Sequence, residues 1–327
     1  MGSFYLEKNL GEIEMRSIVK LAMAMIMVIG IALSAAACST GNSTTTNGSI
    51  QITDQLGRTV TLNGTPQRII SLAPANTEIL FALGLGDKVV GDTDYCNYPA
   101  EAQNVSKVGG FSTPTIEKIV ALEPYVVFAA PIHEDTVIPQ LENLGIKVIA
   151  LAPTTINETY DAIELVGNVT GVQKAADTLV KNMKARINAV TSLVANLSDK
   201  EKPNVFYIVW HDPLMSAGGD TLQSQIIELA GGKNIFVNSS GYPPVSLETV
   251  LDRNPDIIIA STGMGSGVDA PLNWALNESR LQVTNASKEG KIFSINTDLT
   301  GRFGPRIVDA VEEMFRLIHP DLAAKLK

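Results

Sequence analysis

Residues that bind metals or form disulfides are scarce in this chain of 327 residues. It contains two cysteines, Cys38 and Cys96, and three histidines, with no Cys-x-x-Cys or His-x-x-x-His spacing. A metal centre needs several converging thiolate, imidazole or carboxylate ligands, so the sequence gives no indication of one. A disulfide framework is not indicated either, because a chain this long can bury an adequate core without it. We expect no metal and no cofactor, and we interpret Cys96 as a small buried or half-buried residue.

Signatures of enzymes and of nucleic-acid binding are also missing from the sequence. Ser266 lies between glycines in GMGSGVD, but without the spacing of a nucleophile elbow. No glycine-rich phosphate loop of the right form occurs, and His133 and His211 are interpreted as polar loop residues. The formal net charge of −9 argues against nucleic acid, which attracts basic surfaces. We therefore expect a protein that is not an enzyme and has no nucleic-acid partner.

The first 38 residues have the order of a secretory signal. In MRSIVKLAMAMIMVIGIALSAAAC, Arg16 and Lys20 precede an apolar segment at 21–33, and small residues lead to Cys38. The apolar segment is short for a membrane span, which needs about 20 residues. An uncleaved membrane anchor is the alternative. We interpret residues 1–38 as a signal peptide of an exported protein.

The end of this signal resembles a lipoprotein processing site, with Ala35 where leucine is usual. We therefore expect lipidation at Cys38 and a flexible tether at 39–49, where the sequence is polar and of low complexity. The protein would then be anchored to the outer face of the cytoplasmic membrane, periplasmic or at the cell surface. Frequent Asn-x-Ser/Thr sequons, such as those at Asn63 and Asn196, fit either glycosylation or a secreted composition rich in Asn and Thr.

Short apolar runs without polar alternation recur in both halves of the chain. They occupy residues 68–73, 88–91, 125–130, 147–151, 204–210, 234–237, 256–260 and 291–295. Such runs, separated by helical patterns at 76–84 and 115–122, are typical of parallel sheets buried on both faces. Between the halves, apolar residues at steps of three and four predict a continuous helix over 172–197. The pattern predicts an α/β protein: an N-terminal lobe at 50–165, a connecting helix within 166–200, and a C-terminal lobe at 201–327.

One sequence pattern occurs twice in the chain, and we call it the repeated phrase. TIEKIVALEPYVVFA at 115–129 and SLETVLDRNPDIIIA at 246–260 both begin with a hydroxyl residue and an aliphatic residue before a glutamate. These glutamates are Glu117 and Glu248, and in both copies a proline precedes an apolar run. Any two α/β units could share part of such a phrase. Because glutamate, proline and strand all match, we favour two similar lobes that leave a cleft between them, where parallel sheets commonly bind ligands.

Aromatic and charged residues gather in the loops that follow the predicted strands. They are Tyr95, Phe111, Trp210, Tyr242, Asp298 and Arg302. Flat aromatic faces suit a large, partly apolar ligand, and an arginine or aspartate can fix its polar edge. Each aromatic ring alone could simply cap the core of its lobe. As a set, we interpret these residues as the ligand-binding residues of the cleft.

Three segments carry a family resemblance. RIISLAPANTEILFALGLGDKVVGDTDYCNYPAEA, GGFSTPTIEKIVALEPYVVFAA and DLTGRFGPRIV closely resemble substrate-binding proteins of cobalamin and iron-chelate ABC importers, in order and in spacing, over roughly residues 50–322. The resemblance implies two Rossmann-like lobes with parallel sheets, joined by one long backbone helix with limited hinge motion. It also implies a monomer that delivers a small-molecule ligand to an ABC permease dimer with its ATPase. Glu117 and Glu248 fall on the family positions that dock on arginines of the two permease subunits.

The resemblance also concerns the cargo, for which it favours a corrinoid such as cobalamin. The family's ligand contacts fall on Tyr95, Phe111, Tyr242, Asp298 and Arg302. Phe111 and Tyr242 stand where a similar cobalamin binder has tryptophans, and Ala130 replaces another. A ferric siderophore or haem is the alternative, for which Arg302 and Arg306 are the evident cationic groups. A tethered extracellular sensor, or an enzyme that uses this fold, is a remoter alternative.

Overall fold

The computed structural model describes residues 49–263 and 269–326. The predicted signal peptide, Cys38 and residues 39–48 of the predicted tether lie outside the described residues. No helix within these two ranges is long and apolar enough to cross a membrane. The described chain opens with an antiparallel hairpin of β1 (Ser49–Thr53) and β2 (Thr59–Asn63).

The N-terminal lobe contains a parallel sheet with strand order β4-β3-β5-β6. Its strands are β3 (Ile69–Ser71), β4 (Val89–Gly91), β5 (Val126–Ala129) and β6 (Lys147–Ala150). Its helices are α2 (Pro74–Ala82), α3 (Ile116–Ala121) and α4 (Val137–Asn143), with 3-10 turns at Gly86–Lys88, Ala100–Asn104 and Pro131–His133. Val126 and Phe128 of β5 belong to one buried cluster and Val127 to another, so the sheet is buried on both faces. The four predicted strands of this half are confirmed.

The C-terminal lobe contains a second sheet, with order β11-β10-β7-β8 and β9 paired to β7. Its strands are β7 (Asn204–His211), β8 (Leu214–Ser216), β9 (Lys233–Asn234), β10 (Ile257–Thr262) and β11 (Ile292–Asn296). Its helices are α7 (Leu222–Leu229), α8 (Leu247–Arg253), α9 (Ala270–Asn277), α10 (Asn285–Lys288), α11 (Thr297–Thr300), α12 (Ile307–Ile318) and α13 (Pro320–Ala323), with a 3-10 turn at Ser279–Val283. All strand pairs are parallel except that of β7 and β8.

One predicted strand of this lobe is wrong. Of the apolar run at 234–237, only the first residue, Asn234, belongs to a strand paired with β7, because the chain turns there. The Asn234 side-chain oxygen accepts a hydrogen bond from the backbone N–H of Phe236, 2.9 Å away, which closes a local turn. Phe236 is buried and packs with Phe206 of β7. The apolar run therefore fills the core from a turn instead of extending the sheet.

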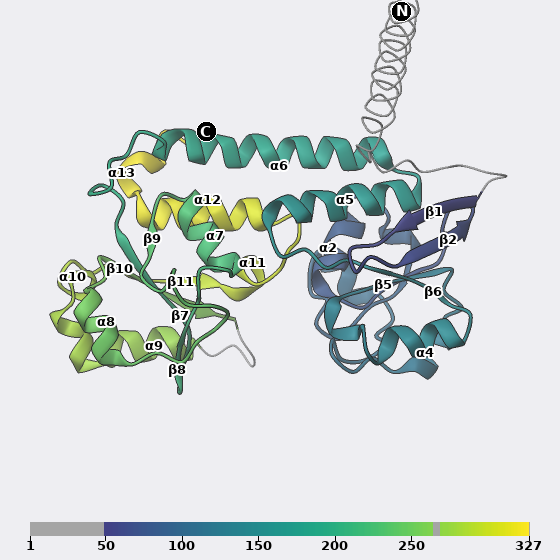
Figure 1. The fold of residues 1–327 in the computed structure, drawn as a ribbon, viewed down its shortest axis with the longest axis horizontal. Coiled ribbons are helices and arrows are strands. Elements are labelled where there is room, and N and C mark those ends of the chain that lie inside the picture. Colours follow the sequence, from purple (N-terminus) through teal and green to yellow (C-terminus); the bar gives the residue numbers. More distant parts are fainter. Residues whose placement is uncertain (1–48, 264–268, 327) are drawn as a thin grey trace, which may run out of the picture. The chain divides into compact units, whose positions relative to one another are not determined.

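Two helices link the lobes. α5 (Ile156–Thr170) ends at Gly171, whose φ of 74° reverses the chain, and α6 (Gln173–Val194) then leads toward β7. α6 lies within the predicted helical range 166–200, whereas α5 runs across the predicted limit at 165. In Figure 1, α6 extends above both lobes, with α5 and α12 beneath it. One continuous apolar cluster includes residues of α5, α6, α12 and both sheets, so both lobes pack on a shared helical layer.

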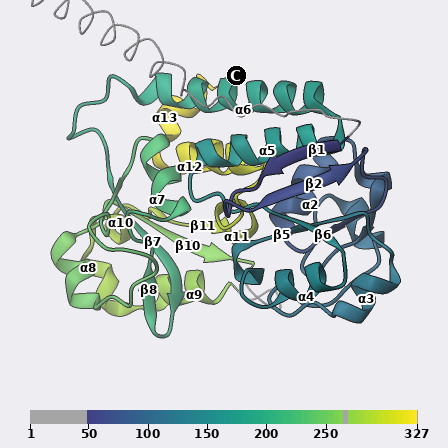
Figure 2. The ribbon, with the colours of Figure 1, turned by 45° about the vertical axis from the view of Figure 1, so that its right-hand side comes forward.

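The repeated phrase forms the same unit in both lobes. It begins with a short helix (α3 or α8) and continues through a left-handed residue and a proline into a buried strand (β5 or β10). The left-handed residues are Glu123, with φ 47°, and Asn254, with φ 42°. In Figure 2, α3 and α8 lie on opposite lobes, on the side away from α6. The match predicted from the sequence is therefore a match in backbone conformation.

Candidate functional site

A cleft of about 700 Å³ opens between loops of the two lobes. Its lining from the N-terminal lobe is largely apolar and includes Pro74, Ile79, Phe111, Ala130, Leu151 and Pro153, with Tyr95 at its edge. The C-terminal lobe contributes Thr297, Gly301, Arg302 and Phe303. The uncharged polar side chains of the lining are Asn76, Ser112, Thr113 and Thr297, together with the Tyr95 hydroxyl. This volume lies in the range of sites for small molecules.

The structure brings three of the six predicted ligand residues to this cleft: Tyr95, Phe111 and Arg302. Asp298 is not part of the lining, but it accepts a hydrogen bond from Arg302 at 2.5 Å. Trp210 and Tyr242 do not line the cleft in this structure.

Trp210 and Tyr242 instead have polar contacts within their own lobe. The indole N–H of Trp210 donates to the backbone oxygen of Asp212 at 2.8 Å, which ties the ring to the turn after β7. The Tyr242 hydroxyl donates to the side-chain oxygen of Gln223 at 3.2 Å. The sequence indicated that both rings lie in loops, but it carried no information on these local partners.

Tyr95 lies on a loop that is fixed from beneath by buried polar groups. Cys96 is buried, as predicted, and its sulfur lies 3.1 Å from the Thr77 hydroxyl. Burial raises the pKa of the Cys96 thiol. Asp92 is fully buried and binds the amine of Lys107 at 2.7 Å. Burial raises the pKa of Asp92 to about 6, against the opposing effect of Lys107.

Phe111 is held in the cleft wall by His133. The Nδ1 atom of His133 accepts a hydrogen bond from the N–H of Ala130, so Nε2 carries the proton and donates to the Phe111 backbone oxygen at 2.6 Å. The two rings meet edge to face, with centroids 5.7 Å apart. Burial lowers the pKa of His133, which favours this neutral form. The interpretation of His133 as a loop residue omitted this contact, because the sequence gives no sign that the side chain is buried.

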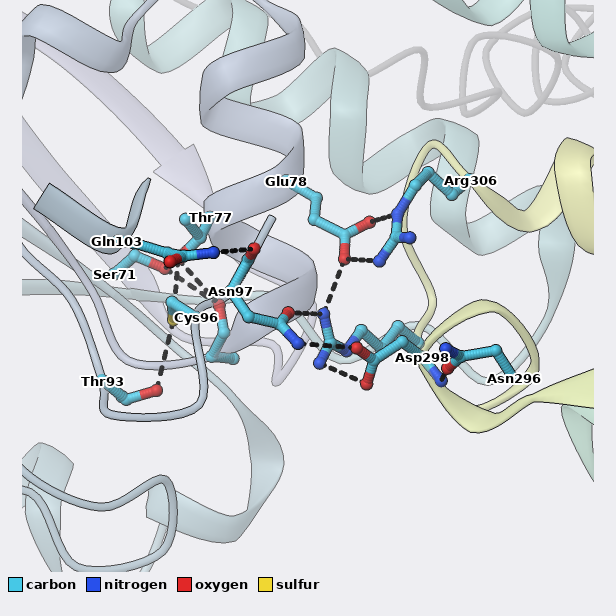
Figure 3. A network of polar contacts seen from close by, with 12 residues as sticks. Ser71, Thr77, Glu78, Thr93, Cys96, Asn97, Gln103, Asn296, Asp298 and Arg306 are labelled. Atoms are coloured by element: carbon cyan, nitrogen blue, oxygen red, sulfur yellow. Dashed lines mark hydrogen bonds and ion pairs between the residues drawn. The ribbon is translucent and has the colours of Figure 1, made fainter. Parts of the chain in front are cut away.

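A set of charged and polar side chains joins the lobes beside the cleft (Figure 3). We call it the cross-lobe network, and it consists of Glu78, Asn97 and Tyr98 from the N-terminal lobe with Asp298, Arg302 and Arg306 from the C-terminal lobe. Glu78 accepts hydrogen bonds from Arg302 at 2.9 Å and from Arg306 at 2.6 and 2.9 Å. The Arg306 guanidinium also lies 4.0 Å from the centre of the Tyr98 ring. The network therefore pairs charges across the junction of the lobes.

Asn97 completes this network and, like Glu78, was missed by the sequence analysis. Its side-chain oxygen accepts from Arg302 at 2.8 Å, and its NH₂ group donates to Asp298 at 2.7 Å. More than 200 positions separate Asn97 from these partners, so sequence spacing could not reveal the contact. For Glu78 one signal was present: an acid inside the apolar helical stretch TEILFALG, where an unpaired charge would be costly.

The predicted docking acids are both exposed and both occupy the second position of a helix. Glu117 lies in α3, and Glu248 lies in α8, where the Ser246 hydroxyl caps the helix by accepting from the N–H of Thr249. A carboxylate in the first turn is favoured by the helix dipole. Neither carboxylate has an ion-pair partner at salt-bridge distance among the described residues. Glu248 still lies close enough to Arg280 for its charge to help raise the pKa of that arginine.

The sequence and the fold both match known proteins. A sequence profile of the family described as periplasmic binding protein matches residues 69–299. The chain is 34% identical over 281 residues to YvrC of Bacillus subtilis (strain 168), named an uncharacterized ABC transporter substrate-binding lipoprotein, with 83% of this chain and 86% of YvrC covered.

Two solved structures share both the fold and a substantial part of the sequence. The periplasmic vitamin B12 binding protein BtuF of Vibrio cholerae is 29% identical with a TM-score of 0.65, and the match covers 80% of this chain and 98% of BtuF. A possible iron-binding, periplasmic solute-binding protein of Staphylococcus epidermidis is 30% identical with a TM-score of 0.68, covering 78% and 99% of the two chains. The two-lobed α/β fold expected from the sequence is therefore confirmed.

Proposed function

The chain belongs to the periplasmic binding protein family and is a substrate-binding component of an ABC importer, and we propose that its cargo is a corrinoid such as cobalamin. The observation that carries this proposal is the chemistry of the cleft lining. Apolar and aromatic surfaces dominate it and uncharged polar groups supplement them. Among the described residues of the lining one side chain is charged, that of Arg302, and it is already paired with Glu78 and Asp298. Such a cleft suits a large ligand without net charge.

Cyanocobalamin has this chemistry. It is electrically neutral, its macrocycle presents a broad face to aromatic rings, and its rim carries amide groups that donate and accept hydrogen bonds. Phe111 and Tyr95 offer rings for the face, and Ser112, Thr113 and Asn76 offer polar groups for the rim. Ala130, a small residue in the lining, leaves room for a bulky ligand. The likeness to the vitamin B12 binding protein of Vibrio cholerae supports the same cargo.

A ferric chelate, such as a ferric siderophore or haem, is the second candidate. The likeness to the possible iron-binding protein of Staphylococcus epidermidis favours it. Haem carries two propionates and ferric catecholates are anionic, and such ligands would be held by arginine. Arg302 lines the cleft and Arg306 belongs to the same network, but Glu78 already binds both of them. This pairing favours the neutral cargo over the anionic one.

We further propose that Glu117 and Glu248 dock the loaded protein on a permease dimer. The support is geometric: both acids are exposed, and they occupy the same position of the repeated helix-and-strand unit, one on each lobe. Two similar acids on two similar lobes match a receptor made of two identical subunits. The ATPase of the importer would act on the far side of that permease.

We propose that the protein works outside the cytoplasm as a monomeric lipoprotein attached through Cys38. The signal-like sequence that ends at Cys38 supports export and lipidation, and so does the lipoprotein name of the Bacillus subtilis relative. Mass spectrometry of the protein purified from its native membrane tests this part. A mature N-terminus at a diacylated Cys38 is expected, and an unmodified Cys38 within an intact N-terminal segment would contradict it.

Equilibrium dialysis of the purified protein against a ligand panel tests the cargo. The panel contains cyanocobalamin, cobinamide, haemin and an anionic ferric catecholate siderophore. We expect retention of the corrinoids with a Kd below about 1 μM and much weaker retention of the iron chelates. Retention of an iron chelate with no retention of either corrinoid would reject the corrinoid and leave the ABC-importer assignment unchanged.

A further inference from the structure

Arg302 belongs both to the cleft and to the cross-lobe network. It is the one formally charged side chain among the described residues that line the cleft. A guanidinium in the wall of a cleft ordinarily attracts carboxylates and other anions. Here its Nη1 atom donates to Glu78 and Asn97, at 2.9 and 2.8 Å, and its Nη2 atom donates to Asp298. Groups of the protein itself therefore occupy the place that an anionic ligand would take.

Glu78 binds both arginines of the network. The residue is 3% exposed and lies on α2. Its Oε1 atom accepts from Arg302 and Arg306, and its Oε2 atom accepts from Nε of Arg306. Burial alone would lower the pKa of Arg306, but the hydrogen bonds and charge of Glu78, together with the charge of Asp298, outweigh burial, so this pKa lies above its ordinary value. Arg306 therefore remains charged despite its partial burial.

The formal charges of this junction cancel. Glu78 and Asp298 contribute two negative charges, and Arg302 and Arg306 contribute two positive charges. Without Glu78 the junction would carry one net positive charge directly beside the cleft, and Arg306 would lose its acidic partner. A charge that is partly shielded from water acts across the width of a small cleft. The negative charge of the buried Glu78 carboxylate therefore contributes to the electrostatic potential that a ligand meets in the cleft.

We propose that Glu78 determines the charge selectivity of the cleft: by compensating Arg302 and Arg306, it favours a neutral cargo and discriminates against anionic chelates. The inference rests on the proposed function and refines it, because it names the residue that separates a corrinoid from an anionic iron chelate. Asp298 contributes less to this selectivity, because it pairs with Arg302 alone and its side chain is 26% exposed against 2% for Glu78.

The test compares two probes on the full-length chain purified in detergent. Cyanocobalamin is neutral, whereas haemin carries two propionates, and the fluorescence of Trp210 and Trp274 reports their binding through quenching. In Glu78→Gln, the affinity for haemin relative to cyanocobalamin is expected to rise about tenfold or more, because one positive charge is uncovered. The gain should shrink in 1 M salt, where charges are screened beyond about 3 Å.

Two further variants test the direction in which the net charge of the junction changes the relative affinity for haemin. Arg306→Gln leaves the junction with one net negative charge, so relative haemin affinity should fall. The double variant Glu78→Gln/Arg306→Gln restores neutrality through the remaining pair of Arg302 and Asp298, so its selectivity should return toward that of the wild type. Glu142→Gln is the control for overall charge, because Glu142 binds Arg58 at 2.8 Å and does not line the cleft.

The outcomes separate this inference from the proposed cargo. If folded Glu78→Gln and Arg306→Gln both keep the wild-type ratio of affinities within about twofold, Glu78 does not determine selectivity. If Glu78→Gln does not fold, Arg306→Gln decides alone, because Glu78 retains Arg302 in that variant. A wild-type protein that prefers haemin rejects the corrinoid, yet a tenfold gain of haemin affinity in Glu78→Gln would still support the action of Glu78.

Discussion

The two lobes share a backbone unit but contribute unequally to the cleft. The phrases at 115–129 and 246–260 fold alike, including a left-handed residue before the proline, and each presents an exposed glutamate at the second position of its helix. The cleft is different, because most of its lining comes from loops of the N-terminal lobe, with four residues from the C-terminal lobe. The repeated unit therefore carries the acids that we propose for docking on the permease, whereas unrepeated loops form the cleft.

Reversing the charge of both proposed docking acids should have the largest effect, which is on transport. It tests whether the matching acids of the two lobes have the same role. In Glu117→Arg/Glu248→Arg, uptake into cells is expected to fall to the level of a strain without the protein. The reason is that arginines at these positions would face the arginines proposed for the permease, and like charges opposed in an interface cost several kcal/mol. Affinity for the ligand should not change. Asp161→Arg/Asp321→Arg, which reverses one exposed acid on each lobe outside the repeated phrases, should transport normally.

Removing the buried acid of the cross-lobe network should have the next largest effect, on stability. Glu78→Ala leaves two guanidinium groups without their shared carboxylate, so the free energy of unfolding should fall by about 3–5 kcal/mol. Asp298→Ala removes a more exposed partner and should cost about 1 kcal/mol. Urea denaturation measures both. Equal losses would mean that Glu78 has no special place in joining the lobes.

The stability of the N-terminal lobe should depend on pH through Asp92, which precedes Tyr95 in the same loop region. The pKa of Asp92 is raised from 3.8 to about 6 by burial, so the folded protein holds a proton that the unfolded chain releases. The contribution of Asp92 to stability is therefore lost as pH rises from about 4 to about 6, by up to about 3 kcal/mol. In Asp92→Asn this loss should be absent.

The difference between the two stability curves tests the effect of Asp92. His133 acts in the opposite sense, because its lowered pKa reduces stability as pH falls below 6.5. Its contribution is common to both proteins and cancels in the difference. A difference that stays constant between pH 4 and pH 6 would contradict the protonation of Asp92 in the folded state.

The sequence predicted what depends on local pattern. Continuous apolar runs located seven strands correctly, and the step of three and four located α6. It failed where a local side-chain contact overrides the pattern, as at Asn234, whose hydrogen bond ends a strand after one residue of the predicted run. It also omitted β1 and β2, in which polar and apolar residues alternate, and β8, in which only Leu214 and Met215 are apolar.

The candidate site was predicted less completely than the fold. Aromatic residues in loops are visible in a sequence, but the side toward which each loop turns is not, so Tyr95 and Tyr242 looked equivalent. Glu78 binds Arg302 and Arg306 over separations of 224 and 228 positions, and such contacts depend on how the two lobes meet. An acid within an apolar helix face was the one local sign of this network.

Calorimetric titration with cyanocobalamin of the wild type, Phe111→Ala and Tyr242→Ala tests the central claim, that a cleft formed mainly by the N-terminal lobe binds a neutral corrinoid. Phe111 lines the cleft and Tyr242 does not, although the sequence suggested both. We expect the wild type to bind, Phe111→Ala to bind at least about tenfold more weakly, and Tyr242→Ala to remain within about twofold of the wild type. An absence of binding by the wild type, or a greater loss in Tyr242→Ala than in Phe111→Ala, would contradict the claim.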